Sequence, residues 1–67
     1  MTEEPLKNRE IIFEVYAIGP YAKIVAMDVA TMTEASIQGP KTTPQPILQR
    51  EAMKKLAYVM RKKGLID

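Results

Sequence analysis

Apolar and polar residues first alternate along this chain and then recur with a helical period. Residues 10–18 and 21–29 are rich in Ile, Val, Phe, Tyr and Ala, so each segment predicts a β-strand. Gly19-Pro20 between them predicts a tight turn with Gly19 at positive φ. Residues 34–38 predict a short third strand whose more polar pattern suits the edge of a sheet.

The C-terminal part of the chain predicts one amphipathic helix over about residues 45–63. At about 100° per residue, Leu48, Ala52, Leu56 and Val59 fall within one narrow arc, and basic residues occupy the opposite side. Two starts are compatible with the sequence: Thr43 as N-cap with Pro44 at the first helical position, or a start at Pro46. Gly64 is expected to end the helix in a Schellman-type turn.

These elements predict an α+β fold: a three-stranded antiparallel β-meander followed by one C-terminal amphipathic α-helix packed on one sheet face. The domain is expected to span residues 9–67, after a mobile tail over residues 1–8. Asp28 is expected to hold the turn after the second strand, because Asp side chains accept nearby backbone N–H groups in turns.

The first two predicted strands are apolar on both faces. A half-solvated antiparallel strand alternates cleanly between apolar and polar residues, so we expect both faces of the sheet to be covered. One helix covers one face. A chain of 67 residues without cysteine or histidine has no disulfide or zinc site to stabilise it. We therefore predict a homodimer or higher homo-oligomer, with Tyr16, Val25 and Met27 on the contact face.

Charge is unevenly distributed along the chain. Residues 1–44 carry four Lys/Arg and six Asp/Glu, and residues 45–67 carry six and two, which gives −2 and +4. The polar side of the predicted helix is a candidate partner or nucleic-acid face, formed by Arg50, Lys54, Tyr58, Arg61 and Lys62. The leading function hypothesis is a non-enzymatic interaction or assembly module that self-associates. The alternative is weak, sequence-independent nucleic-acid binding through this basic face.

Nothing in the sequence indicates an enzyme. Ser36 is the only serine and has no histidine to activate it, and the three glycines match no phosphate-binding fingerprint. Asp28 and Glu34 are interpreted as a turn cap and a surface charge rather than as a weak cation site. We expect no catalytic residues, cofactor, metal or small-molecule substrate. The polar, acidic N-terminus and the lack of a long apolar segment predict a cytoplasmic protein that does not bind membranes.

Several strand and turn segments of the chain form a recognisable pattern: Phe13-Glu14-Val15, Gly19, residues 22–28 and residues 31–40. In these segments the chain resembles a family of short, uncharacterised bacterial cytosolic proteins of unknown function, and the likeness extends over about residues 10–63. The resemblance implies a three-strand meander with a C-terminal helix in a bacterial cytosolic protein, and it implies no known activity. Met32 departs from the pattern, because the family tends to have glycine there, in the left-handed position of the turn.

Overall fold

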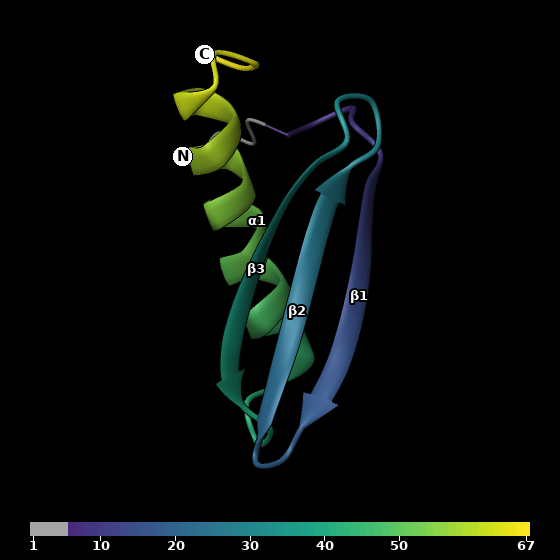
Figure 1. The fold of residues 1–67 in the computed structure, drawn as a ribbon, viewed down its shortest axis with the longest axis vertical. Coiled ribbons are helices and arrows are strands. Elements are labelled where there is room, and N and C mark those ends of the chain that lie inside the picture. Colours follow the sequence, from purple (N-terminus) through teal and green to yellow (C-terminus); the bar gives the residue numbers. More distant parts are fainter. Residues whose placement is uncertain (1–5) are drawn as a thin grey trace.

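The computed structural model describes residues 6–67. Three antiparallel strands, β1 (Ile11–Ile18), β2 (Tyr21–Asp28) and β3 (Thr33–Pro40), form a sheet in the order β1-β2-β3. One helix, α1 (Gln45–Lys62), lies against a single face of that sheet (Figure 1). The predicted β-β-β-α fold is therefore confirmed.

The third strand is longer than the sequence indicated. It continues through Gly39 and Pro40, which pair with Ala22 and Tyr21, instead of ending at residue 38. Alternate residues of an edge strand direct their backbone nitrogen outward, away from the neighbouring strand, and Pro40 is one of them. Its missing N–H therefore removes no hydrogen bond of the sheet. Gly39 lets the strand lie close to the helix, since a Cβ at this position would be 2.7 Å from Cδ2 of Leu48, which would have to move aside.

The first turn has the conformation that the sequence predicts. Gly19 has φ +57°, and Ile18 pairs directly with Tyr21 across a two-residue loop. A glycine at positive φ followed by proline, whose ring fixes a negative φ, is the pattern of a type II′ hairpin turn.

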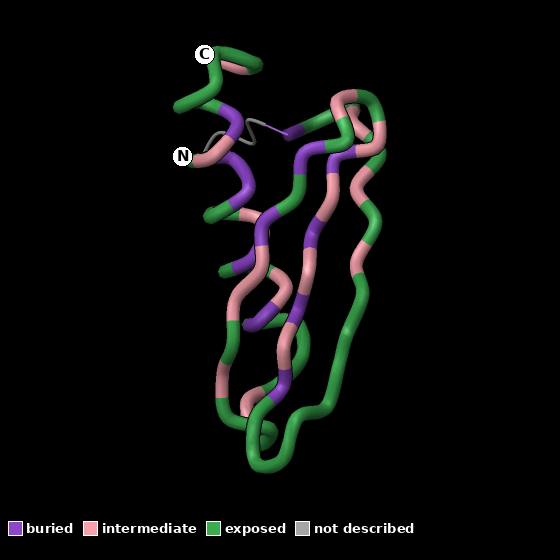
Figure 2. Tube along the Cα trace, viewed as in Figure 1, coloured by how far each residue is buried: buried purple, intermediate pink, exposed green. Residues whose placement is uncertain are grey.

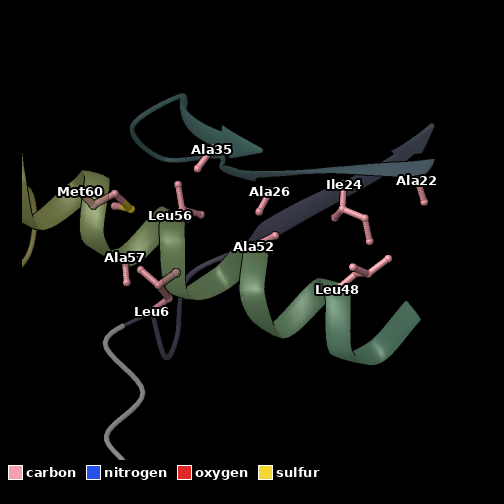
Figure 3. Packing of buried hydrophobic residues seen from close by; sticks show 10 residues of the cluster. All are labelled: Leu6, Ala22, Ile24, Ala26, Ala35, Leu48, Ala52, Leu56, Ala57 and Met60. Carbon is pink, nitrogen blue, oxygen red and sulfur yellow. The ribbon is translucent and has the colours of Figure 1, made fainter. Parts of the chain in front are cut away.

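The core between the sheet and α1 is thin and rich in alanine. Among residues 6–67, five of the ten buried apolar residues are alanines, and only Ile24, Leu56 and Met60 are large apolar side chains with no exposed surface. Figure 3 shows these side chains meeting between the strands and the helix. Small side chains bring the two layers close together but bury little apolar area, so the hydrophobic stabilisation is modest.

The helix lies over β3 and β2 and leaves much of β1 uncovered. Side chains along β2 alternate between buried and half-buried, whereas the C-terminal half of β1 is exposed on both faces (Figure 2). Val15 and Ala17 are therefore exposed even though they belong to the face of the sheet on which the helix packs.

Leu6 adds a core contact in the segment that we expected to be a mobile tail. Its side chain is only 5% exposed and lies beside Ala57 (Figure 3). Ala57 is about 100° around the helix from the sheet-facing Leu56, so it would be expected to face solvent. Instead it is 5% exposed. The expected tail begins with residues 1–5, which lie outside the described residues.

The two ends of α1 differ in how well the sequence predicted them. At the start, the N-cap is Pro44, and Thr43 makes no side-chain cap. At the end, Gly64 has φ +75°, its N–H donates to Arg61 O at 3.0 Å, and Leu65 N–H donates to Met60 O at 2.9 Å. These two bonds form the predicted Schellman motif.

Asp28 organises the second turn from a buried position. Its Oδ2 accepts hydrogen bonds from Thr31 N–H at 3.1 Å and from the Thr31 hydroxyl at 2.7 Å, as the turn interpretation required. Arg9 also reaches this oxygen at 3.1 Å and ties the N-terminal segment to the turn. Burial raises the pKa of the Asp28 carboxyl, but Thr31 and Arg9 outweigh it and hold the pKa below its usual range.

Met32, in the same turn, adopts the left-handed backbone conformation, with φ +57°. This conformation destabilises a residue that has a side chain by about 1–2 kcal/mol. Met32 is 69% exposed, so packing of its side chain offsets little of that cost.

We predict that Met32→Gly stabilises the protein by about 0.5–1 kcal/mol, because glycine adopts positive φ without steric cost. Urea unfolding followed by circular dichroism measures the change. Ala30→Gly is the matched control in the same turn, where φ is not positive. The control should be less stable than the native protein, and equal effects of the two substitutions would contradict the assignment of strain to Met32.

We predict that Asp28→Asn weakens the acid dependence of stability. In the folded chain the pKa of Asp28 lies below its ordinary value of 3.8, so the unfolded chain binds more protons between the two values. The stability that this carboxylate contributes is present above pH 3.8 and is lost as the pH falls through the lowered pKa. Urea midpoints measured down this range should fall less in Asp28→Asn than in the native protein. Thr31→Val removes the hydroxyl that bonds to this carboxylate, so its loss of stability with acid should begin at a higher pH than in the native protein. The same pH dependence of stability in all three proteins would contradict the role assigned to Asp28.

Candidate functional site

The face of the sheet opposite α1 is the first candidate surface, and we call it the open face. Directly paired residues of antiparallel strands lie on the same face, so the strand register defines its members. Within residues 6–67 no helix or strand packs against it. The open face consists of Ile12, Glu14, Tyr16, Ile18, Tyr21, Lys23, Val25, Met27, Glu34, Ser36, Gln38 and Pro40.

The three residues predicted for an oligomer contact, Tyr16, Val25 and Met27, all lie on the open face. Tyr16 comes from β1 and is 46% exposed, while Val25 and Met27 lie on the central strand and are half-buried by their neighbours. Met27 pairs directly with Ile12, which extends the apolar surface onto β1. The structure thus brings these residues together across adjacent strands.

The structure adds three large apolar residues to the three predicted for this surface. Ile12, Ile18 and Tyr21 are 43%, 47% and 51% exposed on the same face. The alternation of β1 already placed Ile12 and Ile18 on the side of Tyr16, so the signal for them was present in the sequence. Tyr21 follows once the hairpin register sets it opposite Ile18.

Charges of both signs lie among these apolar side chains. The Tyr16 hydroxyl donates a hydrogen bond to Glu14 Oε1 at 2.8 Å, and this bond to the carboxylate raises the pKa of Tyr16. Lys23 is opposite Tyr16 on β2, and Glu34 is opposite Met27 on β3. Asp28 lies on the helix side, so the alternative of a cation site shared with Glu34 fails because the two side chains project from opposite faces.

The outer side of α1 is the second candidate surface, and we call it the basic face. All five predicted residues are exposed: Arg50, Lys54, Tyr58, Arg61 and Lys62. The Tyr58 ring is 58% exposed, with Lys62 Nζ 5.8 Å from its centroid. Two of the cations have partners within the chain, because Lys54 lies 3.8 Å from Glu51 and Arg61 Nε donates to Asp67 O at 3.0 Å.

Lys55 lies on the sheet side of the helix, two turns after Leu48 and at nearly the same angle around the helix axis. Its Nζ donates a hydrogen bond to Ser36 O on β3 at 2.8 Å. From that side of the helix its long side chain reaches the neighbouring strand. The lysine therefore covers part of the outer edge of the sheet.

A shallow groove of about 200 Å³ opens between the uncovered part of β1 and the N-terminal end of α1. Val15 and Ala17 form one wall and Leu48 another. The groove exists because the helix is displaced toward β3, so the helix side of β1 has no covering layer there.

Neither a metal centre nor a membrane span is formed by the part of the chain that the structure describes. Residues 6–67 contain no group of three or more Asp, Glu, His or Cys side chains arranged to hold a metal ion. No helix among them is long and apolar enough to cross a lipid bilayer.

Comparison with known proteins identifies a family but no function. A family model described as a domain of unknown function, DUF6898, matches residues 8–63, which include all three strands and α1. No curated protein and no solved structure matches the chain. The expectation of an uncharacterised family is confirmed, and the chain belongs to the DUF6898 family.

Proposed function

We propose that this protein is a small non-enzymatic assembly module that self-associates and uses its open face as a contact surface. The observation that carries the proposal is the chemistry of that face, where a sheet surface with no covering layer within residues 6–67 presents large apolar side chains on both β1 and β2.

An antiparallel sheet with one solvated face normally directs polar residues to that side. In this protein the pairs Ile12–Met27 and Ile18–Tyr21 put apolar side chains opposite one another at both ends of the β1–β2 hairpin. Most of the polar residues of the open face, Glu34, Ser36 and Gln38, lie on β3. The open face therefore becomes more polar from β1 to β3. This difference supports a contact centred on β1 and β2, with β3 at its hydrated rim.

The thin core supports the same proposal. A small chain whose buried residues are half alanine gains little from its own core, and a second copy would add apolar burial. The open face also carries both Lys23 and the acidic residues Glu14 and Glu34. A rotated copy of the same face can therefore align opposite charges, as a twofold contact requires.

The cellular setting and the absence of catalysis are also part of the proposal. We place the protein in the bacterial cytoplasm, on its resemblance to bacterial cytosolic proteins, and assign it no cofactor or substrate. Ser36, the only serine of the chain, lies on β3, and within residues 6–67 its hydroxyl makes no hydrogen bond to a base that would make it a nucleophile.

We predict that the native protein sediments as a dimer or larger species and that Val25→Glu lowers its mass. Val25 is at the centre of the open face, and a buried unpaired carboxylate there would oppose association. Analytical ultracentrifugation over a concentration series measures the mass, and circular dichroism checks the fold. Tyr58→Glu, an exposed aromatic on the far side of α1, is the matched control and should keep the native mass. A native protein that stays a single chain throughout the series would overturn the proposal.

The basic face supports a second candidate function, weak sequence-independent nucleic-acid binding, because Tyr58 is exposed among cations. If self-association is the function, fluorescence anisotropy with single-stranded DNA and RNA should show no salt-sensitive binding at physiological salt. A steep decrease of the affinity with salt, abolished by Lys54→Glu with Arg61→Glu, would instead establish the nucleic-acid function, since each phosphate contact adds about one unit of log–log slope.

A further inference from the structure

We propose that the outer edge of β1 pairs with β1 of a second copy, antiparallel and centred on Val15, so that two sheets join into one. This inference rests on the proposed self-association and adds a second contact, along the edge of the sheet, to the contact through the open face. In this arrangement the open faces of the two copies become one continuous surface.

The two edges of the sheet are protected to very different degrees. On β3, Lys55 occupies the Ser36 carbonyl and Pro40 ends the strand, and lysine and proline are common protections of edge strands. On β1, eight residues contain no lysine and no proline, and Glu14 is the only charge. Within residues 6–67 no strand pairs with the outer edge of β1. An unprotected, mostly apolar edge of this length is a template for strand addition.

The hydrogen-bond pattern identifies the backbone groups that are free on this edge. Val29 N–H donates to Glu10 O at 3.1 Å, which sets the even-numbered residues of β1 as those that bond to β2. The odd-numbered residues Phe13, Val15 and Ala17 therefore direct their N–H and C=O outward. The same alternation directs the Ser36 carbonyl outward on β3, where Lys55 does bind it.

Symmetry restricts how two such edges can pair. Antiparallel neighbours related by a twofold axis have that axis perpendicular to the sheet, so both helices lie on the same side. Directly paired residues lie on the same face of the joined sheet. Residues on one face of β1 are either all even-numbered or all odd-numbered, so the numbers of two paired residues have an even sum. The candidate centres near the middle of the strand are therefore Glu14, Val15 and Tyr16, each facing its own copy.

The side chains favour Val15 as the centre. Centring on Glu14 would put two carboxylates directly opposite each other, which is unfavourable. Centring on Tyr16 would put Glu14 opposite the apolar Ile18 of the partner subunit. Centring on Val15 pairs Ile12 with Ile18 of the partner subunit, and it pairs Glu14 with Tyr16 of the partner subunit. The last pair matches the hydrogen bond that these residues already make within one chain.

The groove beside β1 is compatible with the same register. Phe13 of the partner subunit would be opposite Ala17, at the groove wall that Val15, Ala17 and Leu48 line. A large side chain would thus lie beside a small one in an open apolar depression. Val15, now 47% exposed, would contact its own symmetry mate.

Cysteine cross-linking tests the register directly, because the native chain contains no cysteine. In the Val15-centred register, Val15→Cys faces itself in a hydrogen-bonded pair about 5.5 Å apart between Cα atoms, within the disulfide range of about 4.4–6.8 Å. Mild oxidation should convert this variant to a covalent dimer. Tyr16→Cys is the matched control, since its two copies would be diagonal neighbours about 7–8 Å apart and should remain uncrosslinked.

Val15→Lys provides a second measurement. It should retain the native circular dichroism spectrum, because Val15 is 47% exposed, and should sediment with a lower mass than the native protein. If the native protein is oligomeric but Val15→Cys does not cross-link, or Val15→Lys keeps the native mass, edge pairing is overturned while self-association stands. Cross-linking of Tyr16→Cys alone would assign the contact to packed open faces. A native protein that is a single chain and does not cross-link would overturn both the proposed function and the edge pairing. If extended foreign peptides bind the β1 edge instead, a peptide and not a second copy is the partner of that edge.

Discussion

A single helix can cover one face of a sheet, and this limit shapes the whole protein. The helix α1 packs on β2 and β3 through small side chains, and the contact is close enough that a side chain at Gly39 would overlap Leu48. The contact uses nearly all of the helix's apolar arc, so within residues 6–67 neither the other sheet face nor the end of β1 receives a second layer. The open face, the groove and the free edge of β1 all follow from that shortage of covering structure.

The position of the helix makes the two edges of the sheet unequal. Because α1 lies toward β3, Lys55 reaches the outer carbonyl of Ser36 and protects that edge. The opposite edge lies beyond the reach of the helix, and β1 has no lysine or proline of its own. Exposed apolar side chains accordingly concentrate on β1 and on the open face beside it. A partner that covers this region would contribute the burial that the thin, alanine-rich core does not supply.

The sequence predicted the order and type of all four elements because their signals are local. Alternation and β-branched residues define β1 and β2, a glycine before proline defines the first turn, and a period of 3.6 defines α1. The end of β3 was less predictable. Proline normally ends a strand, and only pairing with Tyr21 on an outer edge makes Pro40 part of β3. The N-cap likewise fell at Pro44 instead of a residue with a capping side chain.

By itself the sequence determined the fold class, the apolar character of both sides of the β1–β2 hairpin, and the basic side of the helix, since each depends on the spacing of residues within one element. Only the tertiary structure decided that Leu6 enters the core against Ala57 and that Arg9 reaches Asp28. It also decided that the Lys55 ammonium binds the Ser36 carbonyl and that Val15 is exposed on the helix side. These outcomes depend on where one layer lies over another. That placement is set by the volumes of side chains far apart in the chain, and no local pattern records it.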